Sequence, residues 1–171
     1  MYKKILSLGL VFVLSFAFIA NSANASGGIL TAGINQLLAN ADSNNPTGVR
    51  GQNEVKIASF NLIALKSRKD VAVNKIIVKN NLNANFALSK DFQNLKLMHN
   101  GIQIAPTIGV LSPWASAQYI FIPSTIIYIP SGQQYTVDVY ADSLANASNI
   151  NRAYSAVSLD KVMGAALAVH D

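Results

Sequence analysis

Asp138 and Asp142 are the residues whose spacing comes closest to that of an acid–base pair. In a β-strand, residues four positions apart share one face, with their backbones about 13 Å apart. The paired carboxylates of glycosidases lie closer together, roughly 5 to 9.5 Å apart. No second catalytic feature accompanies these aspartates, so we expect Asp142 to end its strand and to accept hydrogen bonds from loop amides. A hydrolase is accordingly the third hypothesis for this chain, behind two kinds of binding protein.

Metal and nucleophilic chemistry have few candidate residues. The chain contains no cysteine, and its two histidines, His99 and His170, have no partner at ligand spacing. A calcium site built from Asp70, Asp138 or Asp142 with loop carbonyls is an alternative, because Ca²⁺ takes about six to eight oxygen ligands. No loop has the dense aspartate spacing of a calcium motif, however, and no serine lies in a nucleophile-elbow context. We therefore predict no catalytic residue, no metal site, no cofactor and no enzymatic activity.

Trp114 and Tyr119 are the residues that would bind a sugar. An exposed tryptophan stacks on sugar rings in carbohydrate-binding modules, and Tyr119 is close to Trp114 in the sequence. Buried aromatic side chains are commoner, because they contribute a large area to a hydrophobic core. We therefore favour a core position for Trp114 and keep a carbohydrate-binding module as the alternative function.

Basic residues cluster at one place, Lys66, Arg68 and Lys69. In a charged turn they would contact an anionic polymer of the cell surface, and the alternative is a solvated turn. The formal net charge of +5 falls to +3 when the two lysines of the leader are left out. This mild balance does not indicate a nucleic-acid partner, which usually requires a clustered basic face.

Residues 1–25 have the features of a secretory signal peptide. A lysine pair precedes the apolar stretch Ile5–Ala20, and Ala23-Asn24-Ala25 has the small-x-small form that signal peptidase accepts. The apolar stretch is shorter than the ~20 residues that span a bilayer, which argues against a retained anchor. We expect Ser26 to begin a mature protein without a membrane span. Its expected location is extracellular or at the cell surface, with the periplasm as an alternative.

The rest of the chain predicts short antiparallel strands. Apolar and polar residues alternate over segments that are separated by Asn, Gly and Pro, which is typical of β-strands. The expected strands are Glu54–Leu65, Val71–Lys79, the hairpin Leu95–Ile104 with its turn at Asn100-Gly101, Tyr119–Pro123, Thr125–Ile129, Tyr135–Ala141 and Tyr154–Val162. A phase shift in the first of them predicts a β-bulge near Ala58-Ser59. Sequential hairpins without interleaved helices predict an all-β fold, a single antiparallel β-sandwich of about seven to nine strands.

One domain is expected after the signal peptide. Residues 26–52 would supply a first strand, favoured over a helix, and a polar linker. Residues 53–165 would form the core of the sandwich, and residues 166–171 a tail.

The apolar residues Leu30, Ile34 and Leu37 are candidates for a donated strand. A detached apolar strand can add to the sheet edge of a neighbouring molecule. The alternative is that this segment pairs within its own domain as the first strand.

Short motifs mark the strands and turns along the chain. They are Phe60-Asn61-Leu62, Asp70–Ile76, Asn94–Leu97 with the Asn100-Gly101 turn, Phe121-Ile122-Pro123, Ile129–Gly132 and Tyr135–Asp142. In this order they resemble an immunoglobulin-like β-sandwich module of bacterial secreted and surface proteins, and the likeness covers about residues 29–165. The resemblance implies the fold and an extracellular setting but no active-site residue. We therefore predict a non-enzymatic protein that acts by binding or assembly at the bacterial cell surface, with a surface polymer or a second copy as partner.

Overall fold

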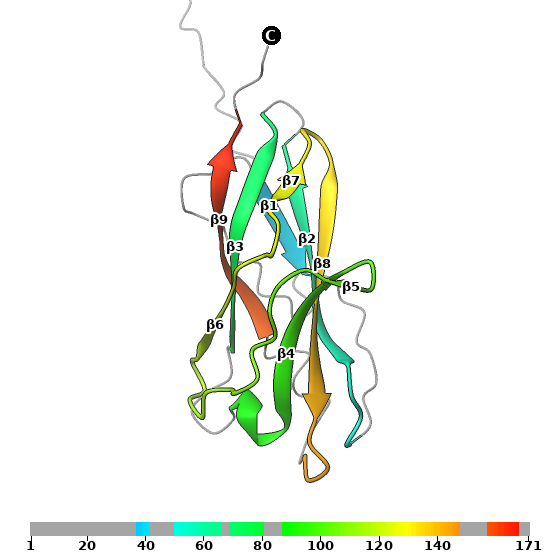
Figure 1. Ribbon diagram of the computed structural model, residues 1–171. Coiled ribbons are helices and arrows are strands. Elements are labelled where there is room, and N and C mark those ends of the chain that lie inside the picture. The colour runs from blue at the N-terminus through cyan, green and yellow to red at the C-terminus, as the bar shows by residue number, and fades with distance from the viewer. Residues whose placement is uncertain (1–36, 42–49, 66–68, 81–86, 148–156, 168–171) are drawn as a thin grey trace, which may run out of the picture.

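The computed structural model describes residues 37–41, 50–65, 69–80, 87–147 and 157–167 (Figure 1). Within these ranges the chain forms β-strands and one 3₁₀ turn, η1 (Leu88–Lys90), and no α-helix. The strands are β1 (Leu37–Ala41), β2 (Val55–Ala64), β3 (Val71–Asn80), β4 (Phe92–His99), β5 (Ile102–Gln103), β6 (Gln118–Phe121), β7 (Ile127–Ile129), β8 (Gln134–Ser143) and β9 (Val157–Ala166). The predicted all-β fold is confirmed.

The strands form two antiparallel sheets. The first has the order β1-β2-β8-β4-β5. In the second, β3 is central: β9 pairs along one edge of β3, while β6 and β7 pair with successive halves of its other edge. Figure 1 shows β3, β6 and β9 as one layer beside the layer of β2, β4 and β8.

The hydrophobic core lies between the inner faces of the two sheets. Alternate residues of each strand point inward, as the period of a β-strand requires. The buried cluster draws on both sheets, with Ile57, Leu62, Leu97 and Val139 from the first and Val73, Ile76, Val78 and Phe121 from the second. Burial of each such side chain contributes about 1.5–3 kcal/mol.

Two local predictions about the backbone are confirmed. The pairing of β2 with β8 shifts register between Lys56 and Ala58, next to the expected bulge. Asn100 and Gly101 have φ values of 48° and 78°, which the two-residue turn between β4 and β5 needs. Both features were predicted from local sequence alone.

The two ends of the chain differ most from what the sequence predicts. β1 begins at Leu37 and pairs with the end of β2 through Leu37 and Ala64, and the rest of the expected first strand lies outside the described residues. β9 continues to Ala166, beyond the expected end at Val162. The proposed signal peptide also lies outside the described ranges. No helix in the described part of the chain is long and apolar enough to cross a membrane.

Candidate functional site

Large apolar side chains are exposed in one part of the chain. Among the described residues they are Ile102, Val110, Trp114, Ile120, Ile122, Ile126 and Tyr128. All of them lie within the stretch Asn100–Val137, which contains no Asp, Glu, Lys, Arg or His. Exposed apolar residues are normally scattered singly, and three of these seven, Ile102, Ile126 and Tyr128, line one groove.

This uncharged stretch contains the neighbouring edges of both sheets. β5 is the last strand of the first sheet, and β6 and β7 follow one edge of β3 in the second. The backbone N–H of Ser124, between β6 and β7, donates a hydrogen bond of 2.8 Å to the carbonyl of Ile104, just after β5. That bond holds the two edges side by side.

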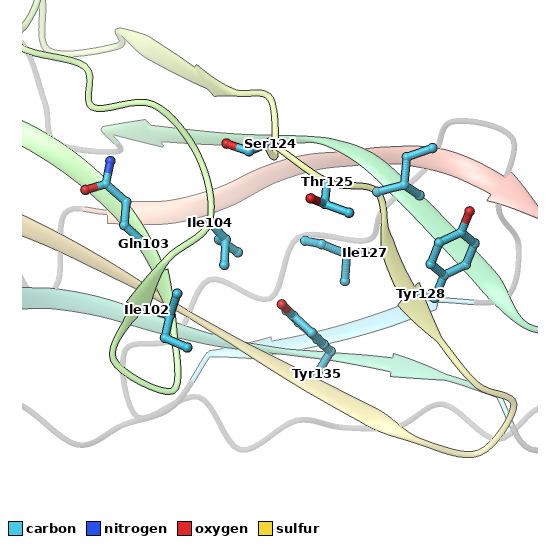
Figure 2. Close-up of a pocket in the computed structure, with 9 residues that line it drawn as sticks. Ile102, Gln103, Ile104, Ser124, Thr125, Ile127, Tyr128 and Tyr135 are labelled. Carbon is cyan, nitrogen blue, oxygen red and sulfur yellow. The ribbon is translucent and has the colours of Figure 1, made fainter.

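A groove of about 370 Å³ runs between these edges. We call it the β5–β7 groove, and its apolar lining consists of Ile102, Ile104, Ile126, Ile127, Tyr128 and Tyr135. Figure 2 shows Ile102 and Ile104 on the β5 side and Ile127 and Tyr128 on the β7 side, with Tyr135 between them. Ile102 is 69% exposed and Tyr128 is 59% exposed, so the groove opens to solvent.

The backbone of β7 also faces the groove. β7 pairs with β3 along one edge, and its other edge has no strand partner among the described residues. Monomeric proteins usually protect such edges with charged side chains, bulges or proline. Here Pro123 and Pro130 flank the edge and limit its length, but no charge protects it. Within the described part of the chain, this edge is therefore open to one further short strand.

Polar groups in the groove are few and uncharged. The Gln103 amide is already engaged, because its Nε2 donates to the carbonyl of Ala105 at 2.7 Å and to Thr107 at 3.0 Å. Ser124 and Thr125 also line the groove and are exposed. Neither residue brings a charge to the groove.

The ring of His99 stacks on the ring of Tyr135. The Nδ1 of His99 lies 2.6 Å from the carbonyl oxygen of Thr136, and the Asn100 amide donates to Nε2 at 3.1 Å. A carbonyl accepts and never donates, so Nδ1 carries a proton and donates it to Thr136. Burial raises the pKa of Tyr135 above its usual value, so the phenol keeps its proton at neutral pH. The wall of the groove is therefore uncharged.

Asp138 and Asp142 lie away from the groove and have separate structural partners. Asp138 accepts a hydrogen bond of 2.6 Å from the Ser59 hydroxyl. Asp142 accepts one of 2.9 Å from the backbone N–H of Glu54 and one of 2.8 Å from the Asn94 side-chain amide. The prediction that Asp142 satisfies loop amides is confirmed.

Asp70, the third residue of the alternative calcium site, is likewise engaged. Its carboxylate accepts a hydrogen bond of 2.8 Å from the backbone N–H of Ser131, in the turn that precedes β8. The described ranges contain no group of three or more His, Asp or Glu side chains able to hold a metal ion.

Trp114 is 73% exposed, and the prediction that it fills the core is wrong. It lies in the connection between β5 and β6, where no strand pairing directs it inward. Tyr119 has the opposite environment: it is 4% exposed, because the alternation of β6 points it into the core, and burial raises its pKa. Tyr119 therefore offers no ring face to a sugar, and Trp114 does not line the β5–β7 groove.

The other candidate residues are described only in part. Lys66, Arg68, Leu30, Ile34 and His170 lie outside the described residues. Lys69 is exposed, and Leu37 belongs to β1, which pairs with β2 of its own chain. Sequence reasoning missed the groove, although the absence of charge between Asn100 and Val137 is visible in the sequence and would have indicated it.

No family model matches this chain, and no curated protein or solved structure does. The contacts and exposure of the described residues are therefore what bears on the candidate site.

Proposed function

We propose that this chain is an exported immunoglobulin-like β-sandwich that acts by binding at the bacterial cell surface and not by catalysis. The leader sequence supports export, and the strand motifs together with two antiparallel sheets over one core support the fold. The polar side chains that would do chemistry, Asp138 and Asp142, are each held by structural partners.

The β5–β7 groove carries the proposal. A partner that covered Ile102, Ile126 and Tyr128 would gain about 1.5–3 kcal/mol for each side chain it removed from water. Part of that gain would be offset by the cost of association. Because the groove offers no charge, a charged partner would lose its hydration without compensation. The partner is therefore an uncharged, largely apolar segment or surface.

Retention of the purified mature chain by intact cells of the source organism tests this function. Ile126→Lys places a charge in the groove and should reduce the retained amount at least tenfold. Val110→Lys is the matched control, because Val110 is 90% exposed and does not line the groove. Equal retention of wild type and Ile126→Lys would refute binding through the groove.

Export is tested separately, by mass spectrometry of the protein recovered from the culture. We expect a chain that begins at Ser26. A chain that keeps residues 1–25 would contradict cleavage and with it the proposed release from the membrane.

A carbohydrate-binding module is the second candidate, and the exposure of Trp114 favours it. Trp114 alone would bind a sugar more weakly than the pair of aromatic rings, Trp114 and Tyr119, that the sequence suggests. The burial of Tyr119 removes the second ring, so we rank this function below binding through the groove.

A further inference from the structure

We propose that the occupant of the β5–β7 groove is the segment Ser26–Gln36 of a second copy of this chain, added as an extended strand beside β7. This inference rests on the proposed function and deepens it by naming the partner. Three properties carry it: the pattern of the segment, the open edge of β7, and the distance between β1 and the groove.

The pattern of the segment fits an uncharged groove. No side chain from Ser26 to Ala41 is charged. Within it, Leu30, Ala32 and Ile34 alternate with Thr31, Gly33 and Asn35. In an extended conformation, alternate residues point to opposite faces, so one face of this strand is apolar and the other small or polar. The apolar face matches the isoleucine and tyrosine lining, and contact between Leu30–Asn35 and the groove would bury no charged side chain.

The open edge of β7 supplies the backbone contacts. A strand added to a sheet edge gains affinity from main-chain hydrogen bonds and specificity from alternate side chains in pockets. β7 is short and is followed by Pro130, so it would accept only a few residues of a partner strand. The run Leu30–Asn35 is long enough to cover it.

The sheet order favours the segment of a neighbour over the chain's own. β1 holds Leu37 at the edge of the first sheet that lies opposite β5. Four strand spacings of ~4.8 Å separate these edges by about 19 Å, which about six extended residues would span. The six residues before Leu37, which include Ile34, would be needed to cross the sheet. If the chain begins at Ser26, about five residues then remain, too few to place both Leu30 and Ile34 in the groove. A neighbouring copy has no such crossing to make.

The resulting contact is heterologous, because the donated segment and the groove are different surfaces of the molecule. Repeated contacts of this kind produce open chains of molecules unless the geometry closes a ring. The mature chain should therefore form species larger than dimers as its concentration rises.

A mixing experiment on the mature chain tests the inference. Ile34→Lys spoils the donated strand and leaves the groove intact, whereas Ile126→Lys spoils the groove and leaves the strand intact. Each variant alone should be monomeric by size-exclusion chromatography with light scattering. An equimolar mixture should form a one-to-one dimer and nothing larger, because one strand and one groove remain usable. Val110→Lys should assemble like the wild type.

Each other outcome has a clear meaning. A mixture that stays monomeric while the wild type assembles, or an Ile34→Lys variant that assembles like the wild type, would overturn the inference. A wild type that stays monomeric at high concentration would overturn it too. The proposed function would survive that result if Ile126→Lys still lost retention by cells. Ile102→Lys, at a more exposed position, replaces Ile126→Lys if circular dichroism shows that Ile126→Lys is unfolded.

Discussion

The imidazole of His99 stacks on the phenol ring of Tyr135, with ring centroids 3.8 Å apart and 14° between the ring planes. His99 ends β4, and Tyr135 lies near the start of β8, the neighbouring strand. Tyr135 also lines the β5–β7 groove. The stacked pair therefore connects the hydrogen bonds of His99 to the position of Tyr135 in the groove.

Removal of the histidine ring should weaken both the sheet and the groove. His99→Ala loses the ring stack and the hydrogen bond to the Thr136 carbonyl. We expect the free energy of unfolding to fall by about 1–2 kcal/mol, measured by urea denaturation. His99→Phe keeps a stacking ring and should recover part of the loss. An unchanged stability in His99→Ala would show that the stack contributes nothing.

Stability should fall at alkaline pH. Burial raises the pKa of Tyr119 and Tyr135 above the usual 10.0, so the folded chain keeps protons that the unfolded chain has lost. The hydrogen bond to Glu54 raises the pKa of Lys96 above its usual 10.5, and that stabilisation is likewise lost as pH rises through the folded value. All three shifts have the same sign.

Urea denaturation from pH 8 to pH 11 measures this effect. We expect a constant free energy of unfolding up to about pH 9 and a decline above about pH 10. Tyr119→Phe should make the decline shallower, because it removes one titrating group. A stability that rises above pH 10 would contradict the direction of these shifts.

Gly164 should tolerate no side chain. A Cβ at this position would collide with the carbonyl oxygen of Ala72 and lie 2.9 Å from the Cα of Val73, both backbone atoms of β3. Gly164→Ala should therefore separate β9 from β3 locally and cost about 3 kcal/mol or abolish folding. Gly109→Ala is the control, because its Cβ would meet Asn94 Oδ1 at 3.6 Å, an ordinary contact. Equal thermal midpoints for the two variants would contradict this close approach.

Trp114 should behave as a solvent-exposed residue. It is the one tryptophan of the chain, so the fluorescence of the protein reports on it directly. We expect emission near the wavelength of tryptophan in water, and a change of less than about 0.5 kcal/mol in unfolding free energy for Trp114→Ala. A core tryptophan would cost about 3–5 kcal/mol. A blue shift on titration with a soluble neutral polysaccharide would instead favour the carbohydrate-binding function.

Most of the strands follow from local sequence, and their partners do not. The alternation in Val71–Lys79 and Tyr135–Ala141 predicts β3 and β8 to within a few residues, because side-chain period and turn residues are local properties. The pairing of β6 and β7 along a single edge of β3 depends on tertiary packing. No periodicity in Tyr119–Ile129 indicates it.

Sequence reasoning missed the geometry of the candidate site for the same reason. Ile102, Ile126 and Tyr135 come from three separate segments of the chain, and the hydrogen bond between Ser124 and Ile104 joins two of these segments. Trp114 was wrongly predicted to be buried. The general preference of aromatic residues for the core carries no information about an individual loop. The absence of charge was the one local signal of this surface.

Hydrogen–deuterium exchange of the mature chain, at low and at high protein concentration, tests the central claim most directly. If the β5–β7 groove binds another copy, amides in Ile102–Ile104 and Ser124–Tyr128 should exchange at least tenfold more slowly at high concentration. Amides around Asp138, on the first sheet and away from the groove, should not change. Protection that appears around Asp138 instead, or exchange in the groove that is independent of concentration while the chain assembles, would contradict the account.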